Sequence, residues 1–477
     1  MKTTNVKTTL LALMMLVLST TVFAQLQTID YSRPMGLDGV NKFETTKTDP
    51  LPFDGLRLRI GAGFTQQFQM LEHSNTATKQ ITNNYTFNSG TSTWSAGTPS
   101  TTVNPNELVK IGNSFNNATA NLNIDVQLEK GVKVSLVTYL SARHHQEAWV
   151  KGGYIQFDQM PFFPWSFVED FMSIATIKIG HMEINYGDQH FRRTDNGNAS
   201  WNPFVGNTVL DAFTTEIGAE LYLQKYGFLG MVAVTNGEIS GSVNAPEKKS
   251  GSLILKGGYD TQLNEDLRVR LTTSYYRNEK GQNNTLYAGD RTGSRYYWVI
   301  ENTAATGTAN AFSGTLNPGY KTDVSAFQVN PFVKFMGFEL FGIYEQTSGK
   351  ATPLDVASKK LTQISGELLY RFDVFGKENV YVGARYNTVN GDVQQDGAII
   401  TKNPNSTTLA DKKEDVRTKT IADATITRMQ FAAGWYFTPN VLAKVEYVNQ
   451  TYDGFGVEDI RSGAKFNGLM FEAVVGF

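Results

Sequence analysis

Cysteine is absent from all 477 residues of this chain. A fold held together by disulfides is therefore excluded, and an exported protein of this size without them is more typical of bacteria than of eukaryotic secretion. Long apolar runs are also missing after residue 24, which excludes a transmembrane helix in the rest of the chain. The net charge of −2 gives no reason to expect nucleic acid as a partner.

The chain is rich in the residues that favour β-structure. It contains 43 Gly, 30 Phe, 21 Tyr and 6 Trp but only 14 Pro, a composition that favours strands and turns. The mean hydropathy is negative, which by itself would suggest a soluble protein. A transmembrane β-barrel has the same average, because every second residue of its strands faces water in the lumen.

The N-terminus has the three parts of a secretory signal peptide. Two lysines precede a short apolar run, Leu10 to Leu18, and the small-residue pattern Val22-Phe23-Ala24 follows. The apolar run is too short to span a bilayer comfortably, so a signal peptide is preferred to an N-terminal membrane anchor. Residues 1–24 are thus removed, and Gln25 is the expected mature N-terminus. Residues 25–54 carry no strand signal and are expected to be either a periplasmic lead-in or a plug in the lumen.

Residues 55–477 alternate between apolar and polar positions in segments of about ten residues. In "LRLRIGAGF", Leu56 and Leu58 share one face, and Arg57 and Arg59 share the other. Strands of a soluble sandwich are about half this length, and no fixed-period repeat supports a β-helix. The prediction is an all-β, transmembrane antiparallel barrel of about 16 strands. The expected strands begin near Leu56, Ala118, Val132, Gln146, Ser173, Asp211, Tyr226, Ser252, Glu265, Asp323, Gly337, Lys360, Glu378, Ala424, Asn440 and Gly463.

The connections between the expected strands alternate in length. Turns such as "EKG", "QKYG" and "FTPN" are short, whereas His73 to Leu108, Glu183 to Leu210, Asn278 to Thr322 and Asn390 to Asp423 are long and polar. Short turns on one rim and long loops on the other are typical of an outer-membrane barrel, with the short rim in the periplasm. Two connections break this pattern, because "RHHQ" is short for an outer loop and "PFFPWSFVED" is long for a periplasmic turn. The segment "RYYWVI", Arg295 to Ile300, is expected to extend a hairpin above the membrane.

The C-terminal residues "LMFEAVVGF" form another amphipathic strand. Phe477, Val475 and Phe471 fall on its apolar face, and the chain stops at its aromatic anchor. A closed barrel must pair its last strand with its first, because no backbone group can stay unsatisfied in lipid. Phe477 is therefore expected in the periplasmic aromatic girdle. The strand also resembles those of outer-membrane proteins whose terminal aromatic residue is read by the barrel-assembly machinery, which the resemblance implies as a partner besides outer-membrane lipid.

If the apolar side chains face lipid, the opposite set lines the lumen. Rings of Arg and Lys favour anions in a pore, although the same charges can simply hydrate the wall or pair across strands. The interpretation depends on register, since a slip of one residue exchanges the two faces of a strand. The basic residues expected in the lumen are Arg57, Arg59, Lys133, Arg143, Lys178, Arg268, Arg270, Arg385, Arg428 and Lys444.

The loop "HMEINYGDQHFRRTDNGNASWNPFVGN", His181 to Asn207, follows the fifth expected strand. Sixteen-stranded porins fold a loop from this position into the lumen, so this loop is predicted to form a pore constriction. The alternative is an ordinary external loop with solvated charges. The side chains predicted to narrow the pore and set its local field are Arg192, Arg193, Asp188, Asp195 and Trp201.

The run "IKIGHMEINYGDQ" resembles the strand-and-loop junction of the phosphate-selective porin O and P family, in its Bacteroidetes branch. Gly180, Met182, Tyr186 and Gly187 match the family pattern, and Asn185 stands where the family has Pro. The architecture that the family implies covers nearly the whole mature chain. Its phosphate selectors carry dense arginine rows, and this chain is sparser in Arg, so the resemblance implies a general or weakly anion-selective porin.

The sequence therefore predicts a passive porin for small hydrophilic solutes or anions, located in a bacterial outer membrane as a homotrimer. The alternative is a structural or secretion-associated barrel with a closed lumen. No enzyme activity, cofactor or metal site is predicted. None of the five His lies in an evident Ser/His/Asn arrangement. The adjacent His144 and His145 would point to opposite faces of a strand, and neither a glycine-rich phosphate-binding motif nor zinc-ligand spacing is present.

Overall fold

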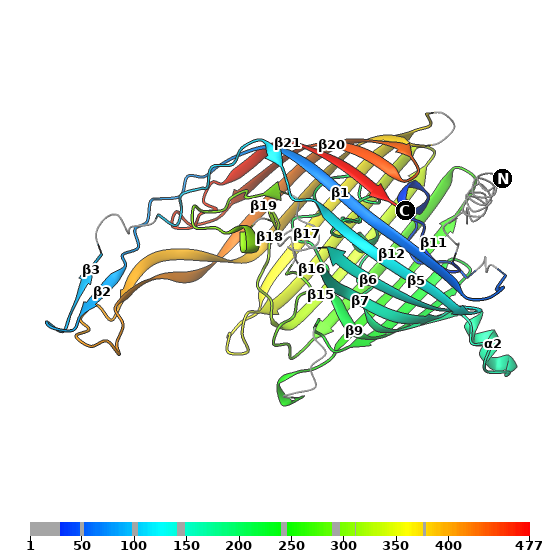
Figure 1. Cartoon of the computed structure of the whole chain (residues 1–477), viewed down its shortest axis with the longest axis horizontal. Helices are drawn as coiled ribbons and strands as arrows, with labels where there is room; N and C mark the ends of the chain where they lie inside the picture. Colours follow the sequence, from blue (N-terminus) through cyan, green and yellow to red (C-terminus); the bar gives the residue numbers. More distant parts are fainter. Residues whose placement is uncertain are drawn as a thin grey trace, which may run out of the picture.

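The computed structural model describes residues 29–47, 52–97, 104–140, 148–239, 246–288, 296–310, 312–374 and 378–477. Sixteen long strands in this described part form one antiparallel sheet that closes on itself (Figure 1), which confirms the predicted barrel. The strands are β1 (Arg57–Ser74), β5 (Thr119–Glu129), β6 (Val132–Leu140), β7 (Ala148–Phe157), β8 (Ala175–Glu183), β9 (Thr215–Lys225), β10 (Phe228–Thr235), β11 (Ser252–Gln262), β12 (Leu267–Asn278), β15 (Thr322–Phe335), β16 (Phe338–Lys350), β17 (Lys359–Phe372), β18 (Val380–Lys402), β19 (Glu414–Thr438), β20 (Val441–Asp453) and β21 (Lys465–Gly476). The predicted signal peptide and the "RHHQ" turn lie outside the described residues.

The barrel closes between its last and first strands. β21 pairs with β1 in antiparallel register, with Phe471 opposite Phe68. Beyond the end of β21, the backbone of Phe477 exchanges two hydrogen bonds with that of Ala62, at 2.9 and 3.0 Å. The two edges that an open sheet would expose to lipid are thereby paired. A two-residue strand, β4 (Ser114–Phe115), adds a short pairing to the same first strand.

The outer face of the wall is apolar along each strand. In β17, Ile364 and Leu368 are exposed on the outside, whereas Glu367 and Leu369 are buried on the inside. Exposed aromatic residues form a girdle along one rim from β10 to the C-terminus, as expected where a barrel meets the lipid headgroups, and this architecture places the protein in a bacterial outer membrane. The exposed girdle residues are Phe228, Tyr259, Phe335, Phe338, Tyr370, Phe372, Trp435, Phe437 and Phe477.

Short turns and long loops lie at opposite ends of the barrel, as predicted. The periplasmic rim carries two-residue turns, such as 130–131 and 336–337, together with the helix α2 (Ser166–Met172), which the "PFFPWSFVED" connection forms. At the other rim β18 and β19 continue outward as an arm, contacted by the small sheet of β2 (Tyr85–Asn88) and β3 (Thr93–Ala96) (Figure 1). Among the described residues, no helix is long and apolar enough to cross a bilayer. The remaining helical turns are η1 (Gly36–Gly39), η3 (Gln189–Phe191), η4 (Pro246–Lys248) and α3 (Gly307–Asn310).

Two predictions about the outer loops differ from the structure. β19 begins at Glu414, well before the predicted Ala424, because the arm stands in water on both faces and its sequence loses the lipid-imposed alternation while the strands stay paired. The "RYYWVI" segment was expected above the membrane, and this was wrong. Its described residues, 296–300, begin with β13 (Tyr296–Tyr297), which pairs with β14 (Phe312–Ser313) inside the lumen. The buried Tyr296 hydroxyl donates to Glu446 of β20 at 2.7 Å, so the polar inner wall satisfies it there.

Candidate pore lumen

The connection between β8 and β9, residues 184–214, turns inward and crosses the lumen, and we call it the transverse loop. Near its start, Asp188 forms an ion pair with Arg270 of β12 at 2.8 Å. Further along, the Val209 amide donates to the side chain of Asn387 in β18 at 2.6 Å. Since β8, β12 and β18 are far apart in the order of the sheet, the loop is fixed to the wall on several sides.

The two arginines predicted at the constriction are buried in this loop and paired. Arg192 contacts Glu367 of β17 at 3.1 Å, and Arg193 contacts Asp211, within the loop, at 2.6 Å. Each arginine is 1% exposed. A buried charge is costly unless it is paired and hydrogen-bonded, so these contacts fix the loop in its position across the lumen.

The other three predicted constriction residues are spread along the loop. Asp188 belongs to the anchor on β12. Asp195 bonds to Lys151 of β7, on the wall that faces the loop. The Trp201 ring lies under the guanidinium of Arg33, which comes from the N-terminal segment and is 3.8 Å from the ring centroid. The loop therefore contacts both the wall and the N-terminal segment.

A cavity of about 610 Å³ remains between the transverse loop and the wall formed by β1 and β5 to β8, and we call it the lumen cavity. Of the five residues predicted at the constriction, Arg193, Asp195 and Trp201 line it, whereas Arg192 and Asp188 do not. A smaller cavity of about 220 Å³ adjoins it and shares charged residues of β1, β5 and β8. The structure thus brings three of the five predicted residues to one polar space.

Most charged side chains around the lumen cavity are paired. Arg59 of β1 bonds to Asp125 of β5, and Lys151 contacts Glu183 at 3.4 Å as well as Asp195. Opposite charges this close cancel much of each other's field in the lumen. Within the described residues, no group of three or more His, Asp or Glu side chains could hold a metal ion.

Arg33 contributes a positive charge that forms no ion pair within the described part of the chain. Its Nε donates to the carbonyl of Gly39 at 2.9 Å, and its Nη2 is buried without a hydrogen-bond partner there. Burial, and after it the charge of Arg192, lowers the pKa of Arg33 to about 9, so it stays protonated at neutral pH. Burial also lowers the pKa of His190, which lines the same cavity and is therefore neutral. The lumen cavity consequently contains one positive charge that no carboxylate neutralises directly.

Residues 29–47 cross the periplasmic mouth of the barrel. The Leu37 amide donates to the carbonyl of Pro439, in the turn between β19 and β20, at 2.8 Å. Glu44 forms an ion pair with Arg270 of β12 at 2.7 Å. The segment is therefore bonded to separate parts of the wall and carries Arg33 into the lumen between them.

Nine of the ten predicted lumen bases lie within the described residues, on the inner face of the wall, and Arg143 lies outside them. Arg385 contacts Glu367 at 2.7 Å, and Lys444 bonds to Glu472. Two others bond to carbonyl groups of the segments that enter the lumen. The wall therefore has many bases but little uncompensated positive charge. The nine are Arg57, Arg59, Lys133, Lys178, Arg268, Arg270, Arg385, Arg428 and Lys444.

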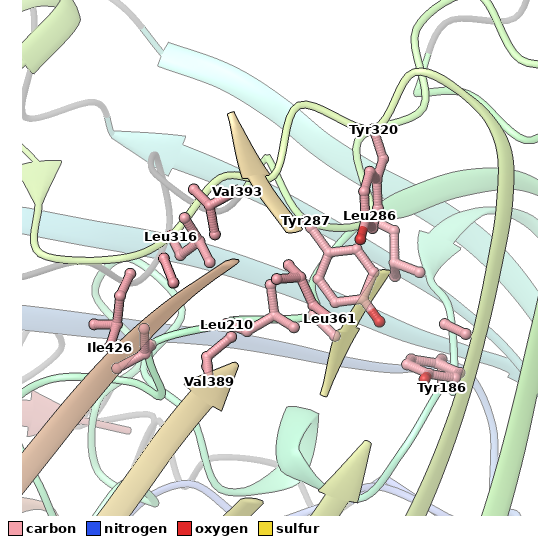
Figure 2. Close-up of a cluster of buried hydrophobic side chains, with 14 of the residues drawn as sticks. Tyr186, Leu210, Leu286, Tyr287, Leu316, Tyr320, Leu361, Val389, Val393 and Ile426 are labelled. Atoms are coloured by element: carbon pink, nitrogen blue, oxygen red, sulfur yellow. The ribbon is translucent and has the colours of Figure 1, made fainter. Parts of the chain in front are cut away.

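Above the transverse loop, the connection between β12 and β15 also turns inward. Figure 2 shows Leu286 and Tyr287 of this connection close to Tyr186 and Leu210 of the transverse loop, in one buried apolar cluster. The hydroxyls of Tyr186 and Tyr287 donate to Glu345 of β16 at 3.0 and 2.6 Å. The cluster includes inner-face residues of β9 to β12, of β15 and of β17 to β21, together with Leu71 of β1. It therefore fills the lumen mainly on the side away from the lumen cavity.

Sequence reasoning missed several residues that line the lumen cavity, among them Arg33 and Lys151. Arg33 belongs to a segment without strand alternation, which gives no indication of where its side chain points. Lys151 sits where the pairing of β6 with β7 shifts register, between Val137 and Thr138. Such an irregularity makes the inward and outward faces ambiguous in the sequence. The only indication in the sequence was that Lys151 lies between Val150 and two glycines, a pattern that can mark a β-bulge.

No protein-family model and no curated protein sequence matches the chain. Among solved structures it is similar to OmpT of Vibrio cholerae, with 10% identity and a TM-score of 0.45 over 90% of this chain and 100% of that one. The anion-selective porin of Comamonas acidovorans has 10% identity and a TM-score of 0.47, covering 89% and 99%. The outer membrane channel DcaP of Acinetobacter baumannii has 10% identity and a TM-score of 0.45, covering 89% and 98%. Similarity at this level supports no conclusion about function. The barrel fold is established by the strand pairing of this chain.

Proposed function

We propose that this protein is an outer-membrane porin through which small hydrophilic solutes diffuse passively. The observation that carries the proposal is the lumen cavity, a charged space inside a closed barrel and beside a loop that crosses the lumen. A purely structural barrel gains nothing from such a space, because buried charges cost free energy that an apolar filling would not. In this proposal Arg193, Asp195 and Trp201 border the passage, and Arg192 and Asp188 hold the loop in place.

We also propose a weak preference for anions. Fixed positive charge at a narrow point favours anions, and Arg33 supplies it where the other basic side chains of the cavity are paired. A preference for phosphate, the property of the family that the run Gly180 to Gly187 resembles, is the stricter form of the proposal, and the sparser arginines of this chain argue against it. Guanidinium groups suit it, since their N–H donors match oxyanion geometry.

In planar bilayers, the purified protein is expected to give steady conductance steps, in groups of three if it is the homotrimer that we also propose. Under a KCl gradient, the reversal potential is expected to shift from zero towards the equilibrium potential of chloride. Arg33→Ala is expected to move it markedly towards zero, because the unpaired charge is removed and no carboxylate loses its partner. Lys402→Ala removes the same charge from the exposed arm and serves as the control.

The possible outcomes separate the parts of the proposal. A barrel that inserts but passes no steady current would contradict the porin function and indicate the closed lumen instead. A steady current with a reversal potential that Arg33→Ala leaves unchanged would reject the anion preference at this residue. Phosphate added at constant chloride is expected to reduce the chloride current if phosphate binds in the passage, and no reduction would reject the stricter form.

We propose that Phe477, Val475 and Phe471 form the signal read by the barrel-assembly machinery. Phe477→Ala keeps the backbone bonds to Ala62 that close the barrel and removes only the lipid-facing ring. We expect it to reduce strongly the amount of heat-modifiable protein in the outer membrane of cells, with refolding of the purified chain in detergent unchanged. Equal losses in cells and in detergent would indicate a structural role of the ring instead.

A further inference from the structure

A row of exposed aromatic rings extends from the periplasmic rim beside α2, and we call it the aromatic ladder. It consists of Phe162, Phe163, Trp165 and Phe167, whose successive ring centroids are 4.9, 5.2 and 5.8 Å apart. The last two pairs are stacked, at interplanar angles of 13° and 9°. The four side chains are 55%, 41%, 53% and 66% exposed. In Figure 1, α2 projects beyond the rim at the end of the barrel opposite the arm.

The ladder is continuous with the lipid-facing wall. Phe157, the last residue of β7, packs edge-on against Phe162 with ring centroids 6.3 Å apart. Gln156 precedes it and is buried on the lumen side, so Phe157 faces outward by alternation. At the other end of the connection, Met172 is buried with 2% exposure, which seats the helix on the barrel. The ladder therefore begins at the height where the wall leaves the lipid.

We propose that the aromatic ladder inserts into the periplasmic leaflet of the outer membrane and binds zwitterionic phospholipid there. Aromatic rings are favoured at the membrane interface, where an apolar body can be buried beside polar headgroups. Residues 158–174 contain Asp158, Glu169 and Asp170 but neither Lys nor Arg. This connection consequently has no cationic group to attract anionic headgroups. Because the aromatic ladder continues the lipid-facing wall, lipid is its expected partner, rather than a second copy of the chain or a periplasmic protein.

The neighbouring wall gives a physical reason for the insertion. β8, which follows α2, has 9 residues, whereas β17 has 14. A tilted transmembrane strand needs about 9–11 residues to cross the hydrocarbon core, so β8 is at the lower limit. Apolar surface added at its periplasmic end reduces the mismatch between the wall and the bilayer.

The absence of cysteine makes a single labelled site available. The test uses the full chain with Phe167→Cys, labelled with a nitrobenzoxadiazole fluorophore and refolded into phosphatidylcholine–phosphatidylethanolamine vesicles. Emission is expected at short wavelength, with strong quenching by phospholipid that carries a shallow acyl-chain spin label and weak quenching by aqueous iodide. Val356→Cys, in the exposed loop between β16 and β17, is the matched control and is expected to show the opposite pattern.

The quenching results distinguish insertion into lipid from the alternatives. If iodide quenches the label at position 167 as strongly as the control, the ladder stays in water and the proposal is overturned. Self-quenching that grows with the protein-to-lipid ratio would assign the ladder to a second copy and overturn it as well. Adding Phe163→Ser and Trp165→Ser to the labelled variant is expected to reduce lipid quenching several-fold, while heat-dependent gel mobility shows that the barrel is intact.

Discussion

Deletion of residues 29–47 is expected to raise the single-channel conductance several-fold. The segment crosses the periplasmic mouth of the lumen, so its removal widens the passage at that end. The deletion also frees Lys133, whose ammonium bonds to the carbonyl of Tyr31. Arg270 keeps Asp188 as a partner after Glu44 is lost, whereas Asp158 loses its ion pair with Lys47 and is left to the water that enters the lumen. Conductance in planar bilayers is the measurement.

A deletion of equal length in the arm provides the control. Residues 79–97 contain β2 and β3, which lie beyond the outer rim and touch no part of the lumen cavity. Their removal is expected to leave the conductance unchanged. Heat-dependent gel mobility must remain for both deletions, because it reports a closed barrel. Equal conductance of the wild type and the 29–47 deletion would show that the N-terminal segment does not limit the passage.

The fold could be predicted from the sequence because lipid and lumen impose opposite demands on neighbouring residues. Each strand therefore alternates between apolar and polar residues. The predicted strand starts at Lys360 and Val132 lie within one residue of the observed starts of β17 and β6. The alternation stops where the strands leave the membrane. The arm continues the pairing of β18 with β19 in water, and there Glu414 to Asp423 shows no apolar face that could reveal a strand.

The lumen was harder to predict, because its chemistry depends on register and on segments without periodicity. Alternation places Arg385 and Lys444 inside the barrel. Their partners are Glu367 and Glu472, the residues directly opposite in the neighbouring strands. Pairing of this kind follows only once the register is known. Arg33 had no such signal, since long-range contacts rather than local pattern fix its position.

Arg193→Ala is expected to loosen the transverse loop far more than Arg192→Ala. Arg193 holds Asp211 through two hydrogen bonds, at 2.9 and 2.6 Å, and both side chains are buried. Removing one partner of a buried ion pair costs about 3–5 kcal/mol, because the other charge is left without compensation. Asn207 alone then donates to Asp211 among its described partners. By contrast, the carboxylates that Arg192 contacts keep other guanidinium partners at 2.6 and 2.7 Å.

The loop borders the lumen cavity, so its release is expected to appear as a larger and noisier current in planar bilayers, together with a lower temperature of heat-dependent gel shift. Arg193→Ala/Asp211→Ala removes both charges and is expected to recover much of the quiet wild-type current, because no unpaired carboxylate remains. If the double variant were as noisy as Arg193→Ala, the loss of the arginine's packing against Phe213, 4.1 Å from the ring centroid, would account for the loosening instead of the charge. Quiet, unchanged currents in all three variants would mean that the transverse loop does not border the conducting path.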